Sequence, residues 1–310
     1  MSHGADTAAA GATRRGRAIQ QVLWIVLALN WAVAAAKLGV GYSVNSLAMI
    51  ADGFHSLLDG SSNIIGLVGI YVASRPPDAD HPYGHQKYEA FSALGISLLL
   101  GVTAIELVQE GAARLLEGGR AVPTVMGFAV MLGTMAVNFG VSRYESRRGV
   151  ELQSDVLLAD AAHTGSDVLV SLSVMAGLGA VYAGVYWLDS FVAFVVAGLI
   201  LYIAYGVLRR VLSVLTDTTS LTAREIEKVV LEIPEVLSCS NIRSRGDPPN
   251  LFIDLEIQLD PDFPLWKAHR IAHVVMDRCR IHFGAADVVV HAEPKAPPAV
   301  AVRRRIGGNE

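Results

Sequence analysis

The chain has 310 residues, of which 52% are hydrophobic and only 17% are charged, and its mean hydropathy is +0.42. Soluble domains carry about 25% charged residues, so this composition argues against both a disordered chain and an ordinary soluble enzyme. The formal net charge of -4 offers no basic face of the size that nucleic acid requires.

The charged residues are distributed unevenly along the chain. Residues 18–213 contain 24 of them in 196 positions, whereas residues 214–310 contain 26 in 97 positions, the level of a soluble domain. We therefore expect a membrane domain followed by a water-soluble domain. The predicted divisions are a cytoplasmic N-terminal tail (1–17), the membrane domain (18–213), the soluble domain (214–296) and a disordered C-terminal tail (297–310).

Six apolar runs are long enough to cross a bilayer as helices, which takes about 20 residues. They cover residues 20–41, 46–73, 88–113, 121–142, 153–183 and 188–208. An even number of spans places both termini on one side. Basic residues precede span 1, follow span 6 and lie between spans 2 and 3 and between spans 4 and 5, so the positive-inside rule places the termini in the cytoplasm. This predicts a multi-pass protein of the inner (plasma) membrane.

A cleaved signal peptide is the alternative interpretation of the N-terminus. The Arg-rich residues 14–17, the apolar stretch 22–29 and the small residues Ala34 to Ala36 resemble its three regions. Cleavage would leave five spans and would place the soluble domain opposite the side that the basic loops prefer.

The periodicity of the soluble domain predicts an α+β fold. Residues 221–233 suit a helix that begins with a Thr222 and Glu225 capping box, and a longer helix follows at 264–283. Strands are predicted near 236–245, 250–259 and 286–292, so the element order is αββαβ. The only two cysteines, Cys239 and Cys279, are too few for a disulfide framework or a thiolate metal site, and we expect reduced cytosolic thiols. The predicted fold class is mainly α, a six-helix transmembrane bundle with a cytoplasmic α+β domain.

One ionisable motif occurs twice inside the predicted membrane domain. Spans 2 and 5 both read A-D-x-x-H-x-x-x-D, with the ionisable residues Asp52, His55, Asp59 and Asp160, His163, Asp167. Offsets of three, four and seven residues lie on one face of a helix. A charge at membrane depth costs at least about 2.5–3.5 kcal/mol, so these groups must face each other, water or an ion. A buried polar network that only joins helices is the structural alternative.

The donor types in the two motifs favour a divalent metal. His55 and Asp59 can share one ion, as can His163 and Asp167, and two facing helices would supply two nitrogens and two oxygens. Such a set, with metal–ligand distances of about 2.0–2.2 Å, suits tetrahedral zinc. Cobalt, cadmium, iron and nickel are less favoured alternatives. Metal binds only neutral imidazole and ionised carboxylate, so protons compete for the same site.

Asp52 and Asp160 precede their histidines by three residues, on opposite sides in the predicted orientation. We therefore do not expect both to bind metal. They are predicted to be accessory groups inside the membrane, which orient the histidines or line an aqueous route.

The paired H-x-x-x-D motifs, the six spans and the αββαβ tail resemble the cation diffusion facilitator family over about residues 20–293. The resemblance implies a homodimeric antiporter that expels Zn²⁺ or a similar divalent ion from the cytoplasm in exchange for protons. It also implies alternating access and a ferredoxin-like regulatory tail. The residues that match the family's transport site are His55, Asp59, His163 and Asp167.

The loop between spans 2 and 3 matches a second metal site of the family. The matching residues are Asp78, His81 and His85, with Asp80 as a further candidate ligand. The alternative is a solvated loop whose histidines bind nothing. Lys87 and Asp217 match an interlocking charge pair near the family's dimer interface, although snorkelling of charged side chains to the membrane surface gives the same pattern.

The soluble domain departs from the family's binuclear zinc pattern. Ser240 and Glu256 stand where relatives commonly have His, while His269, His291 and Glu293 match. A single, weaker metal-sensing site is therefore expected in place of a binuclear one, and the alternative is that these histidines only pack or face solvent.

Two functions of other classes are the alternatives. An intramembrane metal-dependent hydrolase would need an open metal position and a general base, but H-E-x-x-H is absent and four protein ligands would close the site. A passive channel uses rings of carboxylates or carbonyls rather than a four-ligand site. The sequence favours a transporter over an enzyme. A lone cation in span 1, Lys37, is expected to snorkel.

Overall fold

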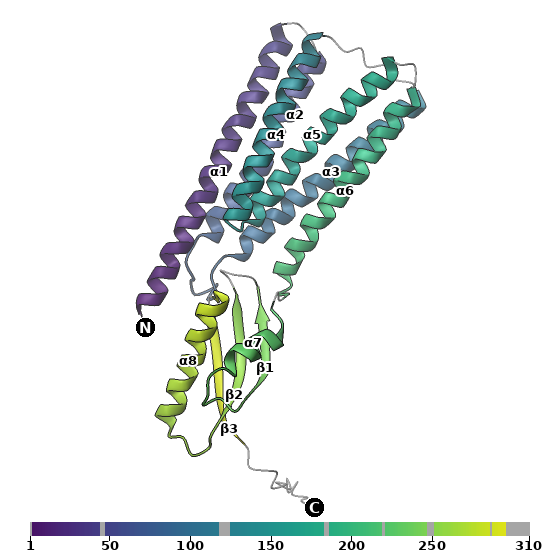
Figure 1. The fold of residues 1–310 in the computed structure, drawn as a ribbon. Helices are drawn as coiled ribbons and strands as arrows, with labels where there is room; N and C mark the ends of the chain where they lie inside the picture. Colours follow the sequence, from purple (N-terminus) through teal and green to yellow (C-terminus); the bar gives the residue numbers. More distant parts are fainter. Residues whose placement is uncertain are drawn as a thin grey trace, which may run out of the picture. The chain divides into compact units, whose positions relative to one another are not determined.

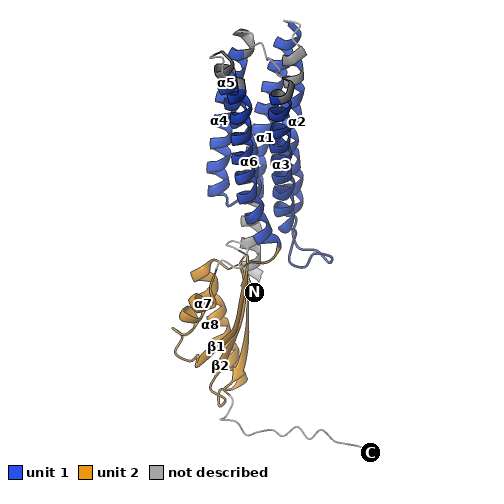
Figure 2. Cartoon of the chain, turned by 90° about the vertical axis from the view of Figure 1, so that its right-hand side faces the viewer, with its two compact units in different colours: residues 1–215 blue, residues 216–310 orange. Residues whose placement is uncertain are grey.

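The computed structural model describes residues 2–43, 47–117, 125–182, 186–218, 221–246, 251–285 and 287–295. The chain divides into two compact units, Met1–Leu215 and Thr216–Glu310 (Figure 2). Within the described residues, the first unit consists of long helices that run side by side (Figure 1): α1 (Ser2–Ser43), α2 (Leu47–Ala73), α3 (Lys87–Glu117), α4 (Val125–Glu151), α5 (Asp155–Tyr182) and α6 (Tyr186–Leu215). The predicted C-terminal tail, 297–310, lies outside the described residues.

Among the described residues, four helical segments are long and apolar enough to cross a membrane. They are Arg14–Ser43, Gly53–Ala73, Lys87–Ala113 and Trp187–Leu215. Helices α4 and α5 contain the other two predicted spans but carry more charge, with three arginines near the end of α4 and three aspartates in α5. Large apolar side chains such as Leu98 and Tyr202 are exposed on the outside of the bundle, as expected where lipid replaces water.

The buried core of the bundle is formed where the helices pack in pairs. Helix α1 packs on α2, α3 on α6 and α4 on α5. Leu23, Ile70, Ile96 and Leu157 are fully buried in one apolar cluster, and a second cluster surrounds Leu100 and Ile200 of α3 and α6. Close packing is needed because dispersion contacts, and not hydrophobic burial, hold helices together in lipid.

An arginine joins three parts of the bundle. The guanidinium of Arg15 in α1 donates to both carboxylate oxygens of Glu89 in α3, at 2.8 and 3.1 Å. It also donates to the carbonyls of Leu152 and Gln153, at 2.8 and 2.7 Å, in the turn between α4 and α5. The Ser154 hydroxyl donates to Glu89 at 2.6 Å, so this bidentate pair fixes the turn as well as two helices.

The second unit has the predicted αββαβ order: α7 (Ala223–Val230), β1 (Ser238–Arg245), β2 (Phe252–Leu259), α8 (Leu265–Phe283) and β3 (Asp287–Pro294). Strand β2 is central, antiparallel to β1 and parallel to β3. The predicted capping box is present, since Thr222 and Glu225 each accept a backbone N–H of the other. Helix α8 ends at Gly284, whose φ of 66° suits a residue without a Cβ.

Both cysteines of the second unit are free thiols. Burial is the main cause that raises the pKa of each, Cys239 and Cys279, to about 11. The thiols are therefore protonated at neutral pH, a state in which cysteine is a poor metal ligand.

Candidate functional site

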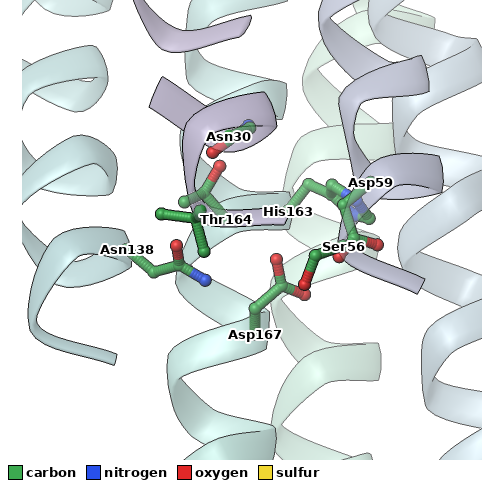
Figure 3. Close-up of a pocket in the computed structure, with 8 residues that line it drawn as sticks. Asn30, Ser56, Asp59, Asn138, His163, Thr164 and Asp167 are labelled. Carbon is green, nitrogen blue, oxygen red and sulfur yellow. The ribbon is translucent and has the colours of Figure 1, made fainter. Parts of the chain in front are cut away.

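A polar pocket lies inside the helical bundle, where α1, α2, α4 and α5 meet. Its lining is polar apart from one valine: Asn30, Val33, Ser56, Asp59, Asn138, His163, Thr164 and Asp167 (Figure 3). The free space is about that of a single water molecule or ion. Polar groups inside a membrane bundle mark a functional site by default, because each is costly to bury there.

Three of the four predicted transport ligands line this pocket. Asp59 comes from α2, and His163 and Asp167 come from successive turns of α5. Figure 3 shows the His163 side chain extending toward Asp59, with the Asp167 carboxylate pointing toward Ser56. His163 is 5% exposed, and its buried Nδ1 has no hydrogen-bond partner among the described residues. A buried imidazole nitrogen without a hydrogen-bond partner is suited to bind a metal ion.

The fourth predicted ligand, His55, is placed differently. Its side chain is 60% exposed, and its Nε2 lies 3.9 Å from Oδ1 of Asp59. It does not line the pocket in this conformation. The side chain of Asp52 lies outside the described residues.

Asp160 is fully buried and binds an asparagine. Its Oδ2 accepts a short hydrogen bond from Nδ2 of Asn63 in α2, and Oδ1 of Asn63 accepts from Nδ2 of Asn30 in α1 at 3.0 Å. Since Nδ1 of His163 has no partner in the described part of the chain, Asp160 does not orient that nitrogen, one of the two roles that the sequence offered for it. Asp160 connects α5 to α2, and through Asn30 it is linked to the pocket.

Glu145 is a buried polar residue that the sequence analysis missed. Span 4 was predicted to end at residue 142, which assigned Glu145 to a basic loop, but α4 continues to Glu151. Glu145 is fully buried on the face of α4 that also buries Val141 and Gly149, and its Oε2 accepts from Thr164 at 3.4 Å. The four-residue spacing of these three positions was the available signal.

Lys37 does not snorkel, contrary to the expectation from the sequence. It is only 8% exposed, and its Nζ donates to Oγ of Ser56 at 2.8 Å. Ser56 lines the pocket, so a cation lies beside a site that contains two carboxylates.

The loop between α2 and α3 brings its three predicted ligands together. One donor atom from each of Asp78, His81 and His85 lies within 4.8 Å of the others. Among the described residues, these three side chains form a group that could hold a metal ion. Asp78 accepts the backbone N–H of His81 at 2.7 Å, and this bond is the main cause that lowers the pKa of its carboxyl. His85 is 5% exposed and its Nδ1 has no partner among the described residues.

The predicted ligands of the second unit are less concentrated. Glu256 lies opposite His291 in the sheet but accepts a 2.6 Å hydrogen bond from Asn241. His291 lies 3.4 Å from Glu293, and His269 packs against the ring of His273 on α8. Within the described residues they do not form a cluster of three close donors.

The two members of the predicted charge pair belong to different units. Lys87 begins α3, and Asp217 follows α6 in the second unit, where it lies 3.8 Å from Arg245. The pairing of Lys87 with Asp217 stays a prediction.

Comparisons with known proteins identify both units. Residues 23–216 match the cation efflux transmembrane domain, and residues 219–295 match the cation efflux protein cytoplasmic domain. An uncharacterised transporter of Methanocaldococcus jannaschii is 29% identical over 89% of this chain and 99% of its own. Cation-efflux pump FieF of Shewanella oneidensis is 28% identical, over 89% and 96%. Manganese efflux system protein MneS of Bacillus subtilis is 27% identical, over 87% and 93%.

These matches cover most of both units and leave residues 1–22, 217–218 and 296–310 unassigned. The family consists of transporters and not of enzymes, and its members are embedded in membranes, in agreement with the apolar helices. With a polar pocket inside the bundle, the matched domains establish that the chain belongs to the cation diffusion facilitator family of cation efflux transporters.

Proposed function

We propose that this protein exports a divalent metal ion, with Zn²⁺ preferred, from the cytoplasm in exchange for protons. The observation that carries this proposal is the pocket in which Asp59, His163 and Asp167 meet, with His55 beside Asp59. A small inward movement of His55 would complete a set of two nitrogens and two oxygens, which suits tetrahedral zinc. The same donors suit cobalt, cadmium, iron or nickel, and the manganese efflux protein among the relatives adds manganese to the alternatives.

Proton exchange follows from the ligand chemistry. An imidazole binds either a proton or a metal, and an unperturbed histidine titrates near pH 6.5, within a physiological gradient. Alternating access requires the pocket to open to each side in turn, which two helices can do by rocking while their ligands stay in place. Helices α2 and α5 are the elements proposed to move.

The proposed membrane arrangement has six spans with both termini in the cytoplasm, in the plasma membrane. The basic residues at the ends of the spans support this orientation. We further propose a homodimer, supported by the match to the family's cytoplasmic domain, and a ferredoxin-like fold for that domain. Lys87 and Asp217 are the proposed charge pair near the dimer interface.

Two additional metal sites are proposed outside the bundle. The loop site of Asp78, His81 and His85 is supported by the proximity of its donors. The site in the second unit would use Glu256, His269, His291 and Glu293 and is proposed to bind one ion weakly, as a sensor of cytoplasmic metal.

Transport in proteoliposomes tests the proposed function. We expect Zn²⁺ flux that depends on an imposed pH gradient and drives proton movement, and we expect His55→Ala and Asp167→Ala to abolish both. His282→Ala and Asp277→Ala, at exposed positions of α8, are the matched controls. Flux that does not depend on the pH gradient would indicate a channel. Normal transport by His55→Ala or Asp167→Ala would contradict the assigned site.

A further inference from the structure

Two buried carboxyl groups face each other beside the pocket. Glu145 in α4 and Asp160 in α5 are both fully buried where hydrogen bonds join their two helices. The Ser142 hydroxyl donates to the carbonyl of Ala161 at 2.7 Å, and Thr164 donates to Glu145 at 3.4 Å, so Glu145 lies opposite the part of α5 that carries Asp160. The helices that carry them are joined by a short turn and pack on each other. Neither residue is one of the proposed metal ligands.

The hydrogen bonds of this pair are incomplete unless a proton is present. Each carboxyl has one oxygen with a donor: Thr164 donates to Oε2 of Glu145, and Asn63 donates to Oδ2 of Asp160. The other two oxygens, Oε1 of Glu145 and Oδ1 of Asp160, are buried and have no donor among the described residues. No Lys, Arg or His side chain in the described part of the chain forms an ion pair with either group.

Two carboxylate anions cannot satisfy each other, because both only accept hydrogen bonds. Their like charges also repel strongly in a site that excludes water. A single proton removes both problems, since one carboxyl then donates its O–H to the other and only one negative charge remains. Carboxyl pairs that share one proton are known to arise for this reason.

Two short polar connections link the pair to the pocket. Asn63, which binds Asp160, is itself bound to Asn30, and Thr164 binds Glu145; both Asn30 and Thr164 line the pocket. The titratable or charged groups nearby on the packed helices are Lys37 of α1, Asp59 of α2, and His163 and Asp167 of α5. The arginines next to Glu145 in α4, Arg143 and Arg147, are exposed.

We infer that Glu145 and Asp160 form a proton-binding site, separate from the metal ligands, that supplies one of the protons exchanged for metal. This inference rests on the proposed function. The protonated pair carries one negative charge when the pocket holds no metal. Entry of a divalent cation favours the doubly ionised pair, so the O–H bond breaks and the proton leaves to water, with its electron pair left on the carboxylate oxygen. Rebinding of a proton restores the shared hydrogen bond and favours release of the cation.

Infrared spectroscopy of the full-length protein in lipid tests the site directly. At neutral pH without metal, we expect the carbonyl-stretching band of a protonated carboxylic acid, and we expect Glu145→Gln and Asp160→Asn each to remove that contribution. Either amide replaces the O–H donor with an N–H donor, so the pair stays hydrogen-bonded and the fold is preserved. Glu151→Gln is the matched control, since this exposed carboxylate lies at the end of the same helix and pairs with Arg148. Equal band intensity in the wild type and both pair variants would overturn the inference.

Proton release on metal binding tests the coupling. In weakly buffered solution with saturating Zn²⁺, we expect Glu145→Gln to release about one proton fewer per chain than the wild type. We also expect it to bind Zn²⁺ more weakly at neutral pH, because the amide mimics the protonated pair. An unchanged proton count in Glu145→Gln would overturn the coupling. If the wild type bound Zn²⁺ but neither released protons nor transported it, the proposed function would fail, while the infrared band would still decide whether the pair holds a proton.

Discussion

The two copies of A-D-x-x-H-x-x-x-D have the same spacing but different surroundings. In α5 the histidine and the first aspartate are buried, with His163 at 5% exposure and Asp160 at 0%. In α2 the side chain of His55 is 60% exposed, although Asp59, one turn further on, lines the same pocket as Asp167. Helix α5 packs against α2, α3, α4 and α6, whereas α2 packs mainly against α1 and α3. The spacing therefore decides which residues share a face, and the neighbouring helices decide how deeply that face is buried.

The last aspartate of the motif, Asp59 in α2 and Asp167 in α5, has the same surroundings in both copies, because both residues line the pocket. We expect Asp59→Asn and Asp167→Asn each to reduce metal transport by about 100-fold or more, because each removes a charged ligand from the pocket. Uptake by proteoliposomes measures the effect, and Asp277→Asn, at an exposed position of α8, is the control. If only the α5 variant lost activity, the α2 copy would not contribute to the site.

The histidines are the part in which the copies differ. We expect His163→Ala to weaken Zn²⁺ binding to the pocket by about 100-fold and His55→Ala by less than that, because His163 already lines the pocket and His55 must move to reach it. Transport, which needs all four ligands, should be lost in both variants. Calorimetric titration measures both affinities in a His81→Ala background, which removes the loop site. A larger loss in His55→Ala would show that the exposed histidine is the stronger ligand.

A direct link between the two helices allows a test of stability. Asn63 of α2 binds Asp160 of α5, so Asn63→Leu leaves a buried carboxyl without its donor and should lower the free energy of unfolding by about 1–3 kcal/mol. The thermal unfolding midpoint of the solubilised protein measures the change. Asn241→Gly is the control, since it breaks an exposed hydrogen bond to Glu256 at a residue whose φ of 49° glycine adopts without strain, and it should change stability by less than about 0.5 kcal/mol. Equal effects of the two variants would mean that the α2 and α5 copies are not coupled through Asn63.

The loop after α2, the second proposed metal site, offers a comparison with the pocket. We expect His81→Ala to bind one Zn²⁺ fewer per chain, measured by metal analysis after dialysis, with His282→Ala unchanged. Because the pKa of the Asp78 carboxyl is lowered, this ligand stays ionised in mildly acidic buffer. An unchanged metal content would favour the interpretation that the loop histidines are only solvated.

Much of the fold and part of the site could be predicted from local patterns. The αββαβ order of the second unit and the Thr222 capping box follow from periodicity and capping chemistry, which depend on neighbours in sequence. The end of α4 could not be predicted in this way, because Arg143, Arg147 and Arg148 are typical of a basic loop between two membrane spans. Helix α4 continues past them because these charges lie outward or near the end while Glu145 faces the bundle.

By itself, the sequence determined that a membrane domain precedes a soluble one, and that two helices each carry a stripe of carboxylate and imidazole on one face. Composition and helical spacing are properties of consecutive residues, so they need no knowledge of packing. Only the tertiary structure decided that His163 and not His55 lines the pocket, that Lys37 binds Ser56, and that Glu145 is buried opposite the part of α5 that carries Asp160. These contacts join different helices, and the approach of one helix to another is set by the shapes and polar groups of all the surfaces that pack together.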